Sequence, residues 1–357
     1  MTVTSTDLYY PAAGDGWERR DPKDLGFDAA KLAEAVAFIE AQGHDLEHEQ
    51  RVSLDLPDNE TVGPIKPKGG VNGLVIRNGY IAAEFGDTPS TEMTYSVAKS
   101  YLSTVAGLAF DRGMIPDLDQ RVSETLDAPE FQGEHNGKIT WRHLLQQTSE
   151  WTGTLWGMRD IADRRKGVDR EIQEPGTFYE YNDVRVNLLG YALLLLWRRP
   201  LREVMHEFVI GPIGGDDNWE WHGYKTSWVN IDGKQIQSVS GGTHFGGGVW
   251  TGSRNHARLG LLFLREGKWG DQQIISERWV REATTPSEVE PVYGFMWWLN
   301  PDRMHFPRLS ERSYSAQGAG GHVIWVSPEH DVVVVLRWVK SDSREECLVR
   351  VVDALMS

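Results

Sequence analysis

The stretch MTYSVAKSYLSTVAGLAFDRG, residues 93–113, decides both the fold and the candidate chemistry of this chain. Its pattern predicts a helix that begins just before Ser96 and ends at Gly113. Residues three apart share one face of a helix, so we expect Ser96 and Lys99 to touch. The apolar run LSTVAGLAF that follows predicts a buried helix, which would carry Lys99 toward the protein interior.

This pair of side chains suggests nucleophilic catalysis. A serine hydroxyl is a weak nucleophile that needs a base, and a desolvated lysine with a lowered pKa can be that base. A helix N-terminus adds positive potential and backbone N–H groups, which can stabilise an oxyanion. Ser-x-x-Lys is short and common, however, and taken alone it is more often part of an ordinary core helix.

Two later segments add candidate groups. In EPGTFYEYNDVRVNLLGYAL, residues 174–193, Tyr181 could share proton transfer with Lys99, although a packing aromatic is the simpler interpretation. In SYSAQGAGGHVIWVSPEHDVVVVL, residues 313–336, glycines precede a strand and would let a substrate approach the backbone. A backbone N–H at this edge could complete an oxyanion hole, whereas a plain glycine-rich strand entry is the alternative.

Taken in order, the three segments resemble the serine β-lactamase and penicillin-binding-protein superfamily. Within it they are most similar to the class C β-lactamase-like esterases and the 6-aminohexanoate-dimer hydrolases. The stretches ITWRHLLQQTS and GGGVWTGSRNHARLGLLFLREGKW are also similar to segments of that family. The resemblance runs from about Gly73 to the C-terminus, and the ordered set is more specific than any one motif.

The resemblance implies roles for four residues. Ser96 would be the acylated nucleophile, and Lys99 its general base or proton partner. Tyr181 matches the first position of the family's Tyr-x-Asn motif. The backbone N–H groups of Ser96 and Ala319 would form the oxyanion hole. No metal ion and no organic cofactor is expected.

Five further residues are expected to contact substrate: Asp183, Gln317, Gly318, His322 and Trp250. Strand alternation alone does not decide whether His322 points into the pocket or away from it. Trp250 belongs to the glycine cluster SGGTHFGGGVWTG, which lacks the Gly-Lys-Ser/Thr ending of a phosphate loop.

The sequence departs from the family pattern at three positions. Asp183 stands where asparagine is usual, and it could bind a cationic or amide-bearing group, hold Lys99 or cap the following helix. Glu150 replaces a glycine. Ala316 replaces the lysine of Lys-Thr-Gly, which supplies positive charge for a substrate carboxylate, so β-lactam hydrolysis is disfavoured.

Strand patterns lie early and late in the chain, and helical patterns lie between them. The early pair surrounds Asn78-Gly79, a strong hairpin signal. We therefore expect an α+β fold, an α/β sandwich of the β-lactamase/transpeptidase-like type, with an antiparallel sheet, flanking helices and a helical subdomain. The expected organisation is a single unit over 1–357, sheet-containing regions at 71–116 and 233–357, and a mostly helical subdomain at 117–232.

The chain of 357 residues carries a net charge of −15, which disfavours nucleic acid and membrane surfaces as partners. No signal-peptide pattern is evident, and the longest apolar run is too short to span a bilayer. The single cysteine, Cys347, excludes an intramolecular disulfide. These features favour a cytoplasmic protein that acts on a small molecule, and its oligomeric state is not predictable.

The expected function is hydrolysis of a small carboxylic ester or amide through an acyl-enzyme at Ser96. A β-lactamase or D-alanyl peptidase is the alternative within enzymes, and Ala316 and the missing export signal count against it. A binding or sensor protein that keeps the fold without turnover is the alternative of another class.

Overall fold

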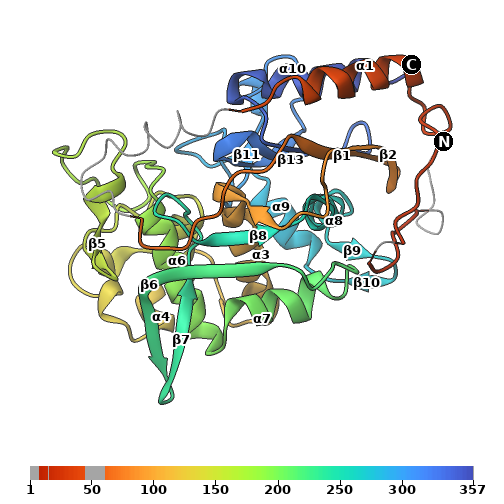
Figure 1. The fold of residues 1–357 in the computed structure, drawn as a ribbon. Coiled ribbons are helices and arrows are strands. Elements are labelled where there is room, and N and C mark those ends of the chain that lie inside the picture. The colour runs from red at the N-terminus through yellow and green to blue at the C-terminus, as the bar shows by residue number, and fades with distance from the viewer. Residues whose placement is uncertain (1–7, 15, 45–60, 357) are drawn as a thin grey trace.

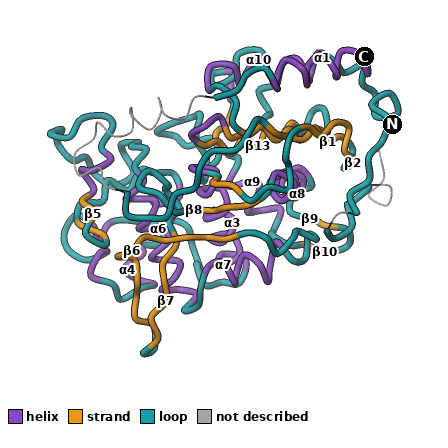
Figure 2. The backbone as a smooth tube through the Cα atoms, viewed as in Figure 1, coloured by secondary structure: helices purple, strands orange, loops and turns teal. Residues whose placement is uncertain are grey.

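The computed structural model describes residues 8–14, 16–44 and 61–356, and it is built around a six-stranded antiparallel sheet (Figures 1 and 2). The two ends of the chain supply its strands, as expected. The strand order is β11-β12-β13-β14-β1-β2. The bounds are β1 Asn72–Arg77, β2 Tyr80–Phe85, β11 Trp298–Leu299, β12 Tyr314–Gly318, β13 His322–Ser327 and β14 Val332–Arg337.

Local signals set the first elements. Asn78 and Gly79 both have positive φ, 52° and 85°, which is the turn that a two-residue hairpin between β1 and β2 requires. Helix α1 (Ala29–Glu40) begins after Asp28, whose carboxylate accepts the backbone N–H groups of Ala30 and Lys31. The sequence predicts this hairpin, and it also predicts a helix over residues 27–42 with Asp28 as its N-cap; both predictions are confirmed. Residues 45–60 of a polar segment predicted as a loop over 44–70 lie outside the described residues.

The two faces of the sheet are covered by different helices. Along β14, Val332 and Val334 belong to the core cluster under α1 and α10 (Arg344–Asp353), which pack together in Figure 1. Val333 and Val335 belong to the opposite cluster, beneath α8 (Ser253–Leu264). Successive side chains of a strand point to opposite faces of the sheet. Both faces of β14 are buried, so a continuous run of valines suits this strand.

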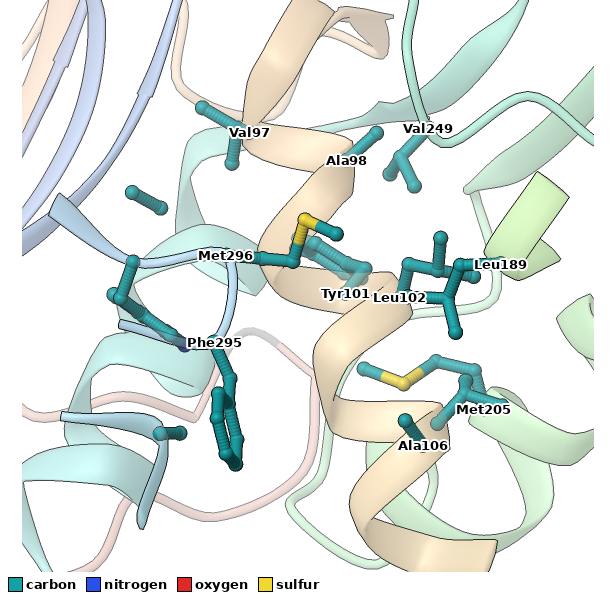
Figure 3. Packing of buried hydrophobic residues seen from close by; sticks show 14 of the residues in the cluster. Val97, Ala98, Tyr101, Leu102, Ala106, Leu189, Met205, Val249, Phe295 and Met296 are labelled. Carbon is teal, nitrogen blue, oxygen red and sulfur yellow. The ribbon is translucent and has the colours of Figure 1, made fainter. Parts of the chain in front are cut away.

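Helix α3 (Ala98–Asp111) lies in the middle of the helical layer, and every residue from Ala98 to Ala109 is buried. A helix that is buried on all sides lies in the core, and this confirms the predicted buried helix. Figure 3 shows side chains of α6 (Asp183–Trp197), α7 (Leu201–Met205) and β8 converging on α3. The start of α3 is thereby held firmly between the two layers.

A second sheet joins the helical layer, with strand order β3-β8-β6-β7. Its strands are β3 Glu92–Met93, β6 Glu220–Ile231, β7 Lys234–Val239 and β8 Gly248–Thr251. Residues 117–232 were predicted to be mostly helical and loop-rich; β6 is a strand inside this range that was not predicted, and it forms a long hairpin with β7. Its turn is Asp232-Gly233, both at positive φ, and this dipeptide is itself a hairpin signal.

The remaining elements are short. They comprise α4 Val122–Thr125, α5 Trp141–Leu145, α9 Glu277–Ala283, β4 Thr154–Leu155, β5 Met158–Arg159, β9 Lys268–Trp269, β10 Gln272–Gln273, the π-helix His206–Ile210 and the 3₁₀ turns Tyr95–Val97, Pro129–Phe131, Asn136–Lys138, Asp160–Asp163, Pro301–Arg303, Ala319–Gly321 and Ser341–Ser343. None of the helices in the described ranges has the length and apolar character needed to cross a membrane.

Candidate active site

Ser96 lies in the 3₁₀ turn Tyr95–Val97, immediately before α3, and its side chain is half-buried. The preceding residue, Tyr95, has a φ of 48°, a left-handed conformation that costs a bulky residue about 1–3 kcal/mol. Its ring packs 5.7 Å from His322 and 6.1 Å from Trp338, between centroids. Tertiary packing thus fixes the backbone directly before the candidate nucleophile.

Lys99 lies one helical turn further on and contacts Ser96, as the spacing predicts. Its Nζ is 2.9 Å from Ser96 Oγ and 2.7 Å from Asp183 Oδ1. The side chains of Lys99 and Asp183 each expose 2% of their surface. The lysine therefore joins a half-buried hydroxyl to a buried carboxylate.

The charge state of Lys99 differs from the expectation of a lowered pKa. Burial alone would lower the pKa of Lys99, but attraction from Asp183 and Tyr181 outweighs it and raises that pKa. Burial would raise the pKa of Asp183, yet Lys99 and Arg165 bring it down to about 2. The paired carboxylate thus favours the charged ammonium form of Lys99.

Asp183, one of the residues expected to contact substrate, binds partners inside the protein. Its carboxylate is buried, and the backbone N–H of His244 donates to Oδ2 at 2.8 Å. Gly242 packs so closely that an added Cβ would lie 2.5 Å from Asp183 Cγ. The glycine cluster therefore serves to bring backbone against this carboxylate. The helix cap is Asn182 rather than Asp183, so of the three alternatives Asp183 holds Lys99.

Tyr181 lies beside this ion pair, with its ring centroid 4.6 Å from Lys99 Nζ. Trp298 stacks on the same ring at 5.6 Å, and Tyr293 meets it edge-on at 6.1 Å. The ring is half-buried. Tyr181, from a distant part of the sequence, is thus brought against the ammonium group of Lys99, which also contacts Ser96.

The end of β12 meets the turn that holds Ser96. A Cβ added to Gly318 would lie 2.6 Å from Thr94 O and 3.1 Å from Ser96 N. Only a residue without a side chain allows this approach. The backbone of Gly318 and Ala319 therefore lies next to the backbone N–H of Ser96, where the oxyanion hole was expected.

The remaining residues expected to contact substrate have partners inside the protein. Gln317 is 8% exposed, and its amide oxygen accepts from Arg344 while its amide nitrogen contacts His305. His322 is 0% exposed and accepts a hydrogen bond from Arg337, so it has no surface to offer a substrate. Trp250 donates to the backbone of Gly247, and no contact that the structure describes joins it to Ser96, Lys99 or Tyr181.

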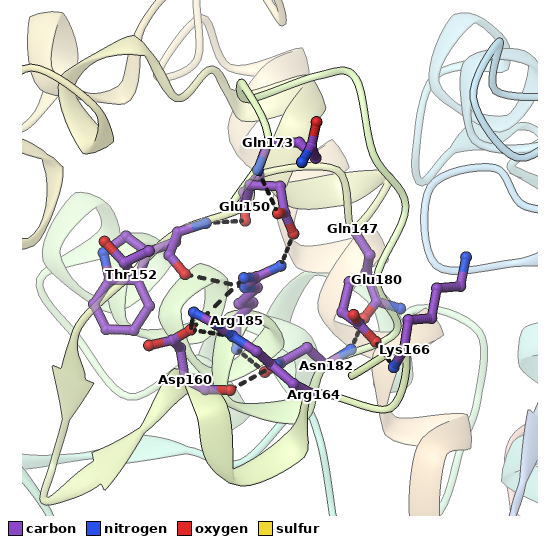
Figure 4. A network of polar contacts seen from close by, with 12 residues as sticks. Gln147, Glu150, Thr152, Asp160, Arg164, Lys166, Gln173, Glu180, Asn182 and Arg185 are labelled. Atoms are coloured by element: carbon purple, nitrogen blue, oxygen red, sulfur yellow. Dashed lines mark hydrogen bonds and ion pairs between the residues drawn. The ribbon is translucent and has the colours of Figure 1, made fainter. Parts of the chain in front are cut away.

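Glu150, the residue that replaces a glycine, lies at the centre of a buried polar network (Figure 4). Its carboxylate binds Arg185 at 2.5 Å and Arg170 at 2.7 Å, and its side chain is 0% exposed. The carboxylate of Glu180 also binds Arg170 and accepts the backbone N–H of Arg165. The network fixes the segment before α6, which carries Tyr181.

Sequence reasoning missed two residues near the site. Arg165 lies 4.9 Å from the Tyr181 ring centroid, and Trp298 stacks on both Tyr181 and His305. The signal for Trp298 was a tryptophan pair in a predicted strand. Nothing local singles out Arg165, because its position depends on how a loop folds. Within the described ranges, no three His, Cys, Asp or Glu residues gather as a metal site.

The sheet, the buried helix and the half-buried serine at its start define a β-lactamase-like protein. Residues 93–347 match the family model described as Beta-lactamase, so the chain belongs to the beta-lactamase family of hydrolases.

A curated relative, "Putative D-alanyl-D-alanine carboxypeptidase" of Escherichia coli O157:H7, is 22% identical over 196 residues, covering 46% of this chain and 45% of the relative. The chain thus matches about half the length of the curated relatives.

Solved structures share the fold. The structure of EstCE1, described as a hydrolase with promiscuous acyltransferase activity, superposes with a TM-score of 0.60 at 17% identity, covering 92% of this chain and 99% of that chain. The "Putative 6-aminohexanoate-dimer hydrolase from Bacillus anthracis" gives a TM-score of 0.58 at 17% identity, covering 85% and 80%. The helix-and-antiparallel-sheet architecture expected from the sequence is confirmed.

Proposed function

We propose that this chain is a serine hydrolase that cleaves a small carboxylic ester or amide through an acyl-enzyme at Ser96. The observation that carries the proposal is the contact between the Lys99 ammonium and the half-buried Ser96 hydroxyl, 2.9 Å long, with Tyr181 beside it. A hydroxyl at a helix start, next to a proton-handling pair, is the arrangement that nucleophilic catalysis needs.

In acylation, Ser96 Oγ attacks the carbonyl carbon and passes its proton to the phenolate form of Tyr181. The Lys99 ammonium, kept charged by Asp183, stabilises negative charge on Ser96 Oγ and on the phenolic oxygen of Tyr181. The backbone N–H groups of Ser96 and Ala319 bind the oxyanion. When the tetrahedral intermediate collapses, the bond to the leaving group breaks, and Tyr181 returns the proton to the leaving oxygen or nitrogen.

In deacylation, water attacks the acyl-enzyme carbonyl and gives its proton to Tyr181. The proton then passes to Ser96 Oγ as the acid departs, which restores the starting state. The residues act here in reverse order, as general acid–base catalysis requires.

The test is the intact mass of the protein after exposure to a fluorophosphonate probe. We expect one adduct on the wild type and none on Ser96→Ala. Ser103→Ala is the matched control, because Ser103 is a buried serine of the same helix and should leave the adduct intact. An adduct that persists on Ser96→Ala would place the nucleophile elsewhere and refute the proposal.

A D-alanyl peptidase or β-lactamase is the second candidate, favoured by the similarity to a "Putative D-alanyl-D-alanine carboxypeptidase". It predicts that a penicillin acylates Ser96, which the same mass measurement would reveal, or is hydrolysed, which the mass of the penicillin itself would reveal. A non-catalytic binding protein predicts no adduct with either probe.

A further inference from the structure

Arg165 lies at the edge of the candidate active site, in the loop that precedes α6. Its guanidinium carbon is 4.9 Å from the Tyr181 ring centroid. Its side chain is 42% exposed, whereas that of its partner, Asp163, is 0% exposed. The Asp163 carboxylate therefore covers the inner side of the Arg165 guanidinium, and the outer side of the guanidinium faces solvent beside Tyr181.

The contact with Asp163 uses only one edge of the guanidinium. Nε donates to Asp163 Oδ1 at 2.8 Å, and Nη2 donates to Oδ2 at 3.1 Å. In the described part of the chain, these are the hydrogen bonds of this side chain. An arginine has five N–H donors in a flat fork, so the edge formed by Nη1 and Nη2 remains open to a second carboxylate.

The open edge is held in place before any ligand arrives. The carboxylate of Glu180 accepts the backbone N–H groups of Arg165 and Lys166, at 3.0 and 3.1 Å. Asp163 is fixed in turn, because its Oδ2 also accepts the backbone N–H of Asp183 at 2.6 Å. A receptor that is already ordered loses less entropy on binding, which favours recognition.

We infer that Arg165 is a specificity-determining residue that binds a carboxylate carried by the leaving group of the substrate. The inference deepens the proposed function and depends on it. In the proposed acylation step Tyr181 returns the proton to the leaving group, and Arg165 lies beside Tyr181, so Arg165 is close to the leaving group. The substrate class is then an ester or amide whose departing alcohol or amine bears a carboxylate. Lys166, exposed next to Arg165, adds positive potential at this edge.

The test compares two isosteric esters, 3-carboxyphenyl hexanoate and 3-carbamoylphenyl hexanoate, by their ratio of kcat/KM. We expect the wild type to prefer the carboxylate, and Arg165→Gln to lose that preference by about tenfold to a hundredfold. Arg165→Lys keeps a charge for Asp163 but loses the fork, and should recover part of the ratio. Arg198→Gln is the matched control, since Arg198 is an exposed, acid-paired arginine on the far end of α6 and should leave the ratio unchanged.

An Arg165→Gln variant that is folded and keeps the wild-type ratio within twofold overturns the inference while the proposed function stands. Calorimetric titration with 3-hydroxybenzoate, the charged product, gives a readout that does not depend on turnover. Its affinity should fall at least tenfold in Arg165→Gln. If the wild type cleaves neither ester and takes up no fluorophosphonate, the proposed function fails. In that case, equal affinity of the wild type and Arg165→Gln for 3-hydroxybenzoate would refute the role of Arg165 as well.

Discussion

Lys99 Nζ lies 2.7 Å from Asp183 Oδ1, and each side chain exposes only 2% of its surface. A buried ammonium loses its hydration, and alone it would tend to release its proton. The carboxylate reverses that tendency and raises the pKa of Lys99. Asp183 therefore determines that Lys99 acts as a cation beside Ser96.

The first prediction concerns Asp183→Asn. Without the carboxylate, burial prevails and the pKa of Lys99 should fall below its ordinary value of 10.5. Because the proposed mechanism needs the Lys99 ammonium, kcat/KM of Asp183→Asn should drop tenfold per pH unit above the lowered pKa of Lys99. In the wild type, kcat/KM should begin to decline only above pH 10.5, because the pKa of Lys99 is raised. The measurement is the pH dependence of kcat/KM between pH 6 and 10.

The matched control is Asp232→Asn, which removes an exposed carboxylate paired with Arg198 and should leave the profile unchanged. Breaking a buried ion pair also costs stability, about 3–5 kcal/mol, so folding of the Asp183→Asn variant has to be verified by circular dichroism. A folded variant with the wild-type profile would contradict the role of Asp183.

The second prediction concerns Tyr181→Phe, which keeps the ring against Trp298 and removes only the oxygen. We expect kcat to fall by about 10²–10⁴, the range for loss of a general acid–base group, with little change in melting temperature. Steady-state kinetics and thermal unfolding check this. The control is Tyr179→Phe, since the buried Tyr179 hydroxyl has no hydrogen-bond partner among the described residues and its loss should preserve activity.

Much of the fold follows from local sequence signals. Asp28 marks the start of α1, Asn78-Gly79 marks the first hairpin, and the apolar run after Ser96 marks the central buried helix. Each is set by neighbours in the chain, so a single sequence suffices to predict it. The strand β6 was not predicted because it lies in a segment that is mostly helix and loop, where the Asp232-Gly233 turn is the local signal for a hairpin.

The electrostatics of the site could not be predicted in the same way. The sign of the Lys99 pKa shift depends on Asp183, which approaches only when α3 and α6 pack together. Gln317 was expected to face substrate, but Arg344 from the last helix occupies its oxygen. Such contacts join distant segments, and no local pattern encodes their distances.

The third prediction concerns Glu150, whose pKa is about 2 because Arg170 and Arg185 outweigh the effect of burial. A carboxyl with a lowered pKa stabilises the fold above its unfolded value of 4.5, and that contribution is lost as the pH falls toward 2. The shift corresponds to roughly 3 kcal/mol. Glu150→Gln should therefore be less stable than the wild type by about this amount at pH 7, and the difference should shrink near pH 2.

Urea unfolding at several pH values measures this difference. The control is Glu174→Gln, which removes a largely exposed carboxylate paired with Lys138 and should shift the unfolding midpoint little. A constant gap between Glu150→Gln and the wild type from pH 7 to pH 2 would show that the ionised network does not govern acid stability.

The fourth prediction concerns Gly318→Ala, which tests whether the end of β12 positions the nucleophile. The backbone of Gly318 is extended, with φ at −141°, so alanine adopts it without strain. The added Cβ would lie 2.6 Å from Thr94 O and 3.1 Å from Ser96 N, and the turn holding Ser96 would have to move. We expect a stability cost of about 1–3 kcal/mol and a loss of kcat of about a hundredfold, the effect of a misplacement near 1 Å.

Gly70→Ala is the control, because nothing lies within 4 Å of its Cβ position and both stability and kcat should stay at wild-type values. Full activity in a stable Gly318→Ala variant would separate this strand from catalysis and remove Ala319 from the proposed oxyanion hole.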